Sequence, residues 1–340
     1  MEDPAEISIR SIANMGRLND IDPSITEVSF RGIQDAIEFP RLPAHVTTIS
    51  MYYVNIRGPV VFSEGLQLLH FSNIISEVPL LHWQFPSTLR QISVTGWNDG
   101  DLDLRSATAP SIRCQNAIRG GSLLLPEGLD DLRIVSSEKV DFPPYLRELF
   151  LGGTGGLMTE ILPSVKALTI NDRSTIVSLE TQFPNLEVLN YANYTEESLG
   201  DIEMDSLREL KIIYPLQGIF YDAIRPKMIL PRLEKLTLVS DGRRREISFD
   251  NPDSTLGGTV QTLILDNAPS FPKIAGEWER LESLNLIVTR SDFKIPFIRW
   301  LEELIVNRPV ITNGYEVSNI DEYKRAWGIR RAKGASTAVY

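Results

Sequence analysis

The chain has 340 residues, a formal net charge of −11 at pH 7 and an isoelectric point near 5.0. This acidity disfavours a general nucleic-acid or anionic-membrane surface, because both need basic patches. No stretch of about 18 apolar residues is present, so no membrane span is predicted. The first residues, MEDPAEISIR, contain no apolar signal segment, and the one cysteine, Cys114, cannot form a disulfide within the chain. We therefore expect a cytoplasmic or nuclear protein.

Residues 1–24 are predicted to form an N-terminal cap. Asp3 can act as a helix N-cap, with Pro4 at the first helical position and Glu6 at the third. The apolar residues that follow lie at helical spacing, and Gly16 suits the end of a helix. We expect this helix to cover the apolar edge of the first repeat.

A repeat covers residues 25–306. An apolar residue, called here the register position, is followed by further apolar residues at +3 and +5. The pattern occurs fourteen times, and most steps between successive copies are 20 or 21 residues long. The register positions are Ile25, Val46, Leu66, Leu89, Ala109, Leu129, Leu146, Val165, Leu186, Leu207, Leu233, Val260, Leu281 and Leu301. A repeat period of this size indicates a solenoid.

A second recurring feature, a residue pair before the register position, supports this repeat. Seven of the repeats have a leucine or phenylalanine followed by proline, two or three residues before the register position. These pairs begin at Leu42, Phe85, Leu125, Phe142, Leu162, Phe183 and Leu230. Proline has no N–H to donate and fits just outside a strand. Each L-x-x-L-x-L segment is therefore predicted to be a short strand.

These repeats resemble the leucine-rich repeat family. The resemblance implies a leucine-rich-repeat solenoid of about 14 repeats, with a curved parallel β-sheet on the concave side and a mostly irregular or 3₁₀ convex side. The family's asparagine or cysteine, eight residues after the register position, is mostly replaced here, for example by Ile33 and Val54. The resemblance also implies protein–protein recognition. One version is a substrate receptor of a ubiquitin ligase, although no F-box-like helical segment precedes residue 25.

Two repeats are longer, with register steps of 26 and 27 residues, and place inserts near 214–230 and 240–258. Inserts in repeat proteins emerge as loops and often carry binding residues. The first insert is rich in aromatic residues and could instead be a short helix packed on the core. The second holds Arg243, Arg244 and Arg245, which could meet an acidic partner or form a solvated loop.

Residues 307–340 depart from the repeat and are predicted to be a C-terminal cap and tail. A helix is expected over 320–333, because Ile320, Tyr323 and Trp327 lie at helical spacing. This helix could cover the last strand, or it could dock elsewhere.

No motif for chemistry is visible. The three histidines, His45, His70 and His82, do not have metal-ligand spacing. No nucleophile elbow, zinc-protease motif or phosphate loop occurs. We therefore predict a non-catalytic protein with no cofactor and no metal.

The binding surface is expected on the inner side of the sheet. Alternate strand residues point to opposite faces, so positions +2, +4 and +6 should face the concavity. Near the C-terminal end these positions form an apolar stretch beside Asp266, consisting of Ile213, Val239, Ile264, Ile287 and Ile305. Arg113, Arg133 and Lys211 could receive an acidic or phosphorylated peptide.

Two functions fit these features. The first is a recognition scaffold that binds a protein partner through the concave face and the 214–258 loops. The second is a permanent structural or regulatory subunit of a larger assembly. The oligomeric state is left open by the sequence.

Overall fold

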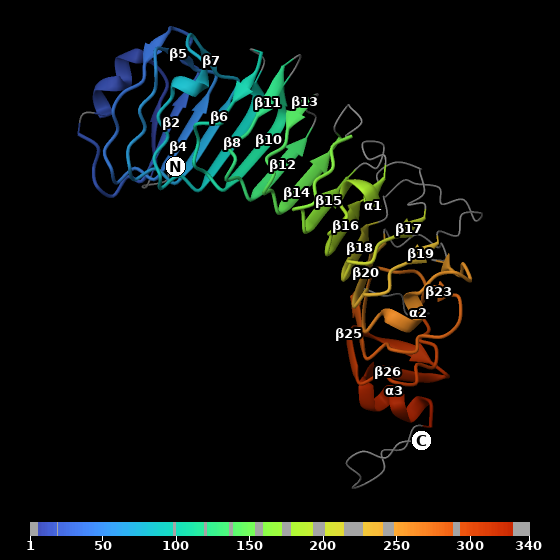
Figure 1. The fold of residues 1–340 in the computed structure, drawn as a ribbon. Coiled ribbons are helices and arrows are strands. Elements are labelled where there is room, and N and C mark those ends of the chain that lie inside the picture. The colour runs from blue at the N-terminus through green and yellow to red at the C-terminus, as the bar shows by residue number, and fades with distance from the viewer. Residues whose placement is uncertain are drawn as a thin grey trace. The chain divides into compact units, whose positions relative to one another are not determined.

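The computed structural model describes residues 6–18, 20–97, 100–118, 121–135, 139–153, 159–171, 178–192, 201–213, 227–240, 248–287 and 293–328. The chain is a parallel β-solenoid of about 12 turns with few helices (Figure 1). It divides into two units. The first consists of Met1–Leu168 and Ser174–Phe183, and the second of Thr169–Arg173 and Pro184–Tyr340.

The first unit carries one long run of parallel strands. In spatial order these are β1 (Glu6–Ile9), β2 (Glu27–Arg31), β4 (Thr48–Tyr52), β6 (Leu68–Ser72), β8 (Gln91–Trp97), β10 (Ser111–Ile118), β12 (Asp131–Val135) and β14 (Glu148–Gly152). Strand β15 (Ala167–Ile170) runs across the division between the units. Short strands on the other side of each turn form two small parallel sheets. These are β3 (Ile37–Glu38), β5 (Asn55–Arg57) and β7 (Ile75–Ser76), and then β9 (Leu102–Asp103), β11 (Ser122–Leu124) and β13 (Lys139–Asp141).

The second unit repeats this plan with longer turns. Its parallel strands are β16 (Val188–Ala192), β18 (Glu209–Ile213), β20 (Lys235–Val239), β22 (Thr262–Asp266), β24 (Ser283–Ile287) and β25 (Glu303–Thr312), and β26 (Tyr315–Asn319) pairs antiparallel to β25. Two-stranded sheets lie on the other side of the turns: β17 (Ile202–Glu203) with β19 (Met228–Ile229), and β21 (Ser248–Phe249) with β23 (Lys273–Ile274). The helices within the described residues are short. They are η1 (Ile12–Leu18), η2 (Leu80–His82), α1 (Leu179–Gln182), α2 (Leu256–Thr259) and α3 (Ile320–Ala326).

The predicted register matches the strand pairing. Every +3 and +5 position lies on a strand of the long runs, and equivalent positions of neighbouring turns face each other, as Leu210, Leu236 and Leu263 do. All +3 side chains are buried. Because a single turn cannot bury its own apolar face, the stacked leucines hold the turns together. The predicted repeat solenoid is confirmed, while the leucine-rich type and the count of fourteen repeats stay predictions.

The turn before each strand has a recurring hydrogen-bond pattern. The proline of the Leu-Pro pair offers its carbonyl to the amide of the register residue, as when Val46 donates to Pro43 at 3.1 Å. At the +1 position, one backbone carbonyl accepts hydrogen bonds from two backbone amides of the following turn. The Thr47 carbonyl, for example, accepts from Gln67 and Leu68 at 2.8 and 3.0 Å. The proline is thus useful because it supplies an acceptor and needs no partner for an N–H.

Hydroxyl groups add a further link between turns. Thr88 donates to the Leu66 carbonyl at 2.9 Å, and Ser206 donates to the Leu186 carbonyl at 2.8 Å. Both lie directly before a register position. At the same place in the β6 turn, a Cβ on Gly65 would collide with the Ala44 carbonyl oxygen, so glycine is needed there. These links join successive turns in a chain that mostly lacks the family's asparagine.

The core differs between the units. In the first, aromatic rings follow one another through successive turns: the ring of Phe62 lies 5.5 Å from that of Phe39 and 5.9 Å from that of Trp83. Trp83 also contacts Phe71, at 6.3 Å between ring centroids. In the second unit the strand positions are mainly leucines. Aromatic rings bury large areas each, so they stabilise the first unit strongly.

The predicted N-terminal helix is wrong over residues 6–9. These residues form β1, which pairs in parallel with β2, and a 3₁₀ helix follows from Ile12 to Leu18. The physical reason is the alternation in Glu6–Ile9. Ile7 and Ile9 point to the buried side, and a strand hides both while also satisfying the edge of β2.

Two further expectations need correction. The side of the turns opposite the long strands is not only irregular, because it contains the small parallel sheets described above. Among the +4 and +6 residues, which are predicted to face the concavity, Ser29, Ser50 and Ser72 are buried and so not accessible to a partner. Such short side chains are hidden by longer neighbours. Arg31, for example, bonds Glu6 and also stacks on the ring of Tyr52 beside this row.

The residues after 306 form a hairpin and a helix. Asn319 caps α3 by accepting a hydrogen bond from the Glu322 amide at 3.0 Å. Tyr323 of α3 is fully buried, and its hydroxyl accepts from the Ile298 amide at 2.7 Å and donates to the Pro296 carbonyl at 2.9 Å. The helix predicted to begin at Ile320 is therefore fixed to the end of the second unit, although α3 ends at Ala326.

Candidate binding face

The five aliphatic residues predicted at the binding surface lie together in the second unit. Ile213, Val239, Asp266 and Ile287 are successive partners in one row across β18, β20, β22 and β24. Ile264 and Ile305 belong to the adjacent +4 row, with Asn285 between them. Neighbouring strands are about 4.8 Å apart, so these side chains form one continuous surface. We call Ile213, Val239, Ile264, Ile287 and Ile305 the aliphatic face.

The aliphatic face is accessible although its strands are already packed on the other side. Ile305 is 49% exposed and Ile287 is 37% exposed, and the other three are half-buried. Leu238 and Leu265, which point to the opposite side of β20 and β22, are fully buried. These strands thus have apolar residues on both sides, as expected of a sheet that is covered twice. Exposed apolar residues clustered in this way are more typical of interaction sites than of an ordinary protein surface.

Charged residues surround the aliphatic face unevenly. At the β18 and β20 end, Lys235 pairs with Glu209 at 2.9 Å and Arg208 pairs with Glu234 at 3.3 Å. At the β24 and β25 end, three exposed carboxylates lie close together and make no ion pair within the described residues; they belong to Glu282, Glu302 and Glu303. The sequence analysis missed these three acids. Glu282 and Glu302 are +1 residues and Glu303 is a +2 residue of the last two repeats, so comparing these two positions between repeats would have identified the acidic group.

The predicted basic residues do not form one site. Arg113 and Arg133 are partners on β10 and β12 in the first unit, and both are exposed. The Arg133 guanidinium lies 6.0 Å from the ring centroid of Phe150. Lys211 belongs to the second unit, on β18 beside Ile213. Arg243, Arg244 and Arg245 lie outside the described residues.

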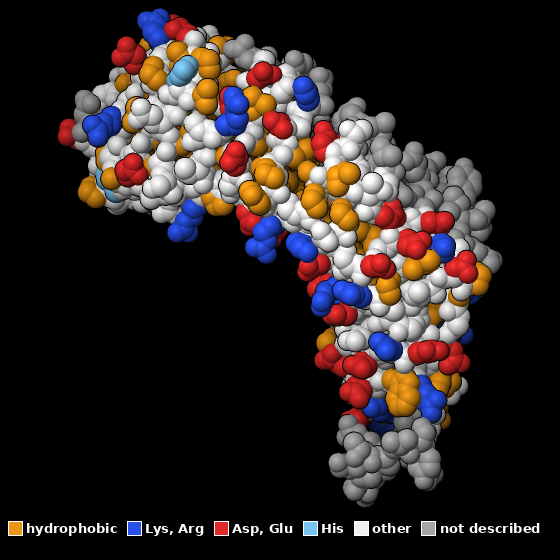
Figure 2. All heavy atoms as spheres, viewed as in Figure 1, with side chains coloured by type: hydrophobic (Ala, Val, Ile, Leu, Met, Phe, Trp, Pro, Cys, Tyr) orange, Lys and Arg blue, Asp and Glu red, His pale blue; other side chains and the backbone are white. Residues whose placement is uncertain are grey.

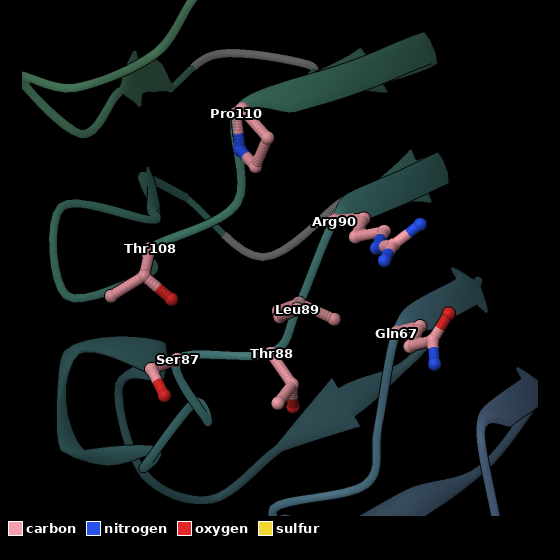
Figure 3. Close-up of a pocket in the computed structure, with 7 residues that line it drawn as sticks. All are labelled: Gln67, Ser87, Thr88, Leu89, Arg90, Thr108 and Pro110. Carbon is pink, nitrogen blue, oxygen red and sulfur yellow. The ribbon is translucent and has the colours of Figure 1, made fainter.

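A shallow pocket in the first unit offers little chemistry. Its volume is about 350 Å³, and it is lined by Gln67, Ser87, Thr88, Leu89, Arg90, Thr108 and Pro110 (Figure 3). The hydroxyls of Thr88 and Thr108 already donate to backbone carbonyls of the preceding turn. Arg90 is the one charged group in the lining. The lining contains no base that could activate a hydroxyl.

Other reactive groups are accounted for by burial. Burial raises the pKa of the Cys114 thiol to about 12, which keeps it protonated and unreactive. Among the described residues, no group of three or more histidine, cysteine or acidic side chains could hold a metal ion. No helix in the described part of the chain is long and apolar enough to cross a membrane.

Comparison with known proteins gives only distant similarity. No family model matches the chain, and no solved structure matches it. The chain is similar to the kinesin-like protein KIN-7K, chloroplastic, of Arabidopsis thaliana, with 25% identity over 172 residues, which cover 48% of this chain and 18% of the relative. It is also similar to the kinesin-like protein KIN-7G of Oryza sativa subsp. japonica, with 25% identity over 175 residues, covering 48% and 19%. The chain thus spans about a fifth of the length of these curated relatives. The fold defines a class, the parallel β-solenoid repeat proteins.

Proposed function

We propose that this chain is a non-catalytic protein-recognition scaffold of the leucine-rich-repeat type. It binds a protein partner through the outward side of the second unit's long strands, with the 214–258 loops contributing. The observation that carries this proposal is the aliphatic face, in which five aliphatic side chains lie on five neighbouring strands whose other sides are already buried. The leucine-rich type is supported by the apolar +3 and +5 columns and the proline turns. A cytoplasmic or nuclear setting belongs to the same proposal.

The size of the aliphatic face indicates what else the partner must touch. Five strands at about 4.8 Å spacing and five residues at about 3.3 Å rise give a patch of roughly 400 Å². A stable interface buries about 800 Å² on each partner. The aliphatic face therefore accounts for the apolar centre of an interface, and polar residues and loops around it supply the rim.

The direct test replaces the two most exposed members with aspartate. A double variant, Ile287→Asp with Ile305→Asp, places two charges on the aliphatic face while leaving the buried side of β24 and β25 unchanged. We expect recovery of bound partners in affinity purification with mass spectrometry to fall at least 10-fold. Leu68→Asp is the matched control, because Leu68 is 43% exposed on a long strand of the first unit. Unchanged recovery with the double variant would contradict the proposal.

The loops need a separate test. Charge reversal at Arg243, Arg244 and Arg245, combined in one variant, asks whether the second insert takes part. We expect partner recovery to fall with this variant as well. If recovery is unchanged, the arginines do not belong to the site, whereas the aliphatic face remains open to its own test.

A second candidate, a permanent subunit of a larger assembly, is favoured by a different observation. Phe297, Trp300, Ile311 and Tyr315 are each 51–61% exposed near the end of the second unit. So many large apolar side chains in one region are typical of a surface that is covered in an obligate complex. Size-exclusion chromatography of the native protein separates the two functions. A free monomer supports recognition of a transient partner, and a fixed heavy assembly supports the subunit role.

A further inference from the structure

We infer that the partner segment recognised by the aliphatic face is basic and amphipathic, an extended peptide in which lysine or arginine alternates with aliphatic residues on one side. This inference rests on the proposed function and specifies the class of partner. It is carried by the carboxylates beside the face, by the absence of ion pairs to them among the described residues, and by their spacing from the aliphatic residues.

The acidic group is formed by residues at the start of two neighbouring turns, at and just before β24 and β25. Glu282 and Glu302 occupy the same +1 position in successive turns, and the backbone carbonyl of Glu282 accepts from the amides of Glu302 and Glu303 at 2.8 and 2.9 Å. Glu303 stands beside them, and its carboxylate accepts a hydrogen bond from the Ser283 hydroxyl at 2.7 Å. Figure 2 shows acidic side chains over the part of the second unit that carries β25. Three carboxylates thus lie near one another without a described cation to offset their repulsion.

The remaining charges around the aliphatic face do not cancel this acidity. Lys235 of β20 and Arg208, which precedes β18, are each paired with a glutamate, as described above. Lys211 on β18 makes no ion pair among the described residues, but β18 is the strand of the aliphatic face farthest from β25. On the far row, Asp266 lies between Val239 and Ile287. The aliphatic residues are therefore bordered by carboxylates on two sides. A cationic partner is attracted to such a surface, whereas nucleic acid, a phosphorylated peptide or an anionic lipid is repelled.

The spacing favours an extended peptide. Glu303 and Ile305 are two residues apart on β25 and point to the same side, so they are separated by about 6.6 Å. Residues i and i+2 of an extended peptide face the same side with the same separation. A peptide with a basic residue at i and an aliphatic residue at i+2 can thus place the cation on Glu303 and the side chain on Ile305.

The experiment uses fluorescence anisotropy with the full chain and three labelled 12-residue peptides. The first repeats Lys-Ser-Ile-Ser, the second repeats Gln-Ser-Ile-Ser, and the third repeats Lys-Ser-Ser-Ser. At about 150 mM salt we expect the first peptide to bind at least 10-fold more tightly than either of the others. We expect its affinity to fall as salt rises, because exposed charge pairs are screened.

Variants place the binding on the surface. The double variant Glu302→Gln with Glu303→Gln should weaken the Lys-Ser-Ile-Ser peptide at least 5-fold and reduce its salt dependence. The double variant Ile287→Ser with Ile305→Ser removes two aliphatic side chains without adding charge, and it should also weaken the Lys-Ser-Ile-Ser peptide at least 5-fold. The matched control is Glu148→Gln, since Glu148 is an exposed +2 residue of the first unit. This variant should bind the peptide unchanged.

The outcomes separate the inference from the function on which it rests. If the Gln and Lys peptides bind alike and only the isoleucine variant weakens them, the basic partner is wrong and recognition by the aliphatic face stands. If the Lys peptide fails to bind, or the Glu148 variant weakens it as much as the Glu302 and Glu303 variant, the inference is overturned. The affinity purification described under the proposed function, with its Ile287→Asp and Ile305→Asp variant, then tests that function independently of the peptide.

Discussion

The two units build the same kind of turn in different ways. In the first unit neighbouring turns are often 20–22 residues apart, and the short strands opposite the long ones form three-stranded sheets. In the second unit, successive turns around β20 are 26 and 27 residues apart, and the opposite sheets have two strands each. The first unit has a connected aromatic core, whereas the second has aliphatic residues on both sides of its strands.

This difference shows where a solenoid has room for function. A turn of about 20 residues is used almost entirely by its strands and two bends, so little of it is free to contact a partner. The longer turns hold the same strands and have residues to spare. Of the side chains that the core does not need, Ile213, Val239 and Ile264 lie on the strands that border these longer turns, and Ile287 and Ile305 continue the same surface on β24 and β25. Predictions that affect one unit and spare the other therefore test this division.

The largest effect is expected for Trp83→Ala in the first unit. Trp83 is 2% exposed and contacts both Phe62 and Phe71. Its removal leaves a large cavity, so we expect the free energy of unfolding to fall by about 3–5 kcal/mol. The loss is measured by urea denaturation, with the labelling of the buried Cys114 thiol as the readout, because Cys114 lies in the same unit.

The matched change in the second unit is Leu236→Ala, at a fully buried +3 position. It is expected to cost about 2–5 kcal/mol. Because each repeat contacts mainly its neighbours, Leu236→Ala should change Cys114 labelling much less than Trp83→Ala does. Equal acceleration of labelling by the two variants would contradict the division into units.

A smaller effect is expected at the end of the second unit, for Tyr323→Phe. The substitution leaves the Ile298 amide without its acceptor, which costs about 1–3 kcal/mol for a buried donor. Amide hydrogen exchange over 293–298 and α3 should become faster. Tyr315→Phe is the control, because Tyr315 is 61% exposed and its loss of a hydroxyl should change stability by less than about 0.5 kcal/mol.

The same tyrosine predicts an alkaline pH dependence. Burial raises the pKa of Tyr323 to about 12, above the usual value of about 10. The folded state therefore holds this proton more tightly than the unfolded state. Its contribution to stability is complete below pH 10 and is lost as the pH rises from 10 to 12. Denaturant titrations between pH 9 and 11 should show a smaller loss in Tyr323→Phe than in the wild type; an equal loss would sink this assignment.

The hydrogen bonds from side-chain hydroxyls to the backbone of the preceding turn should contribute similarly to the stability of both units. Thr88→Val in the first unit and Ser206→Ala in the second each remove one donor to a backbone carbonyl. Each is expected to lower the free energy of unfolding by about 0.5–1.5 kcal/mol. Urea denaturation of both variants checks this. A loss in one unit and none in the other would show that these links matter only where the turns are short.

The smallest effect concerns surface charge pairs. Arg208→Gln breaks the pair with Glu234, in which both side chains are more than half exposed. Pairs of this kind are worth about 0–1 kcal/mol and are screened by salt. Thermal denaturation at low and at high salt should therefore show a small difference that disappears at high salt. A loss above about 2 kcal/mol would mean that the charged edge holds the turns together.

Much of the fold could be predicted from the sequence because one column of residues decides it. Each +3 position, such as Leu210 or Leu263, has to be buried by the next copy, so its spacing gives the strands and their register. The opposite sheets were not predicted. Ile56, Leu123 and Ile202 lie at different distances from their register positions, and strands of two or three residues are too short to show a detectable alternation.

The candidate site was predicted in part for a related reason. The aliphatic face follows from alternation along strands, so its five members could be named in advance. The charges beside it depend on which pairs neutralise each other across turns, as Lys235 and Glu209 do, and this requires distances. The N-terminal segment failed because a capping box and a strand alternation compete over the same residues, and pairing with β2 decided between them.

The most direct test of the account is photo-crosslinking from defined positions. A photoreactive phenylalanine derivative placed at Ile305 of the full chain should form a covalent adduct with the partner, because this position is the most exposed member of the aliphatic face. The same residue placed at Leu68, on the first unit, should form none. Adducts of equal yield from both positions, or adducts from Leu68 alone, would contradict recognition by the second unit.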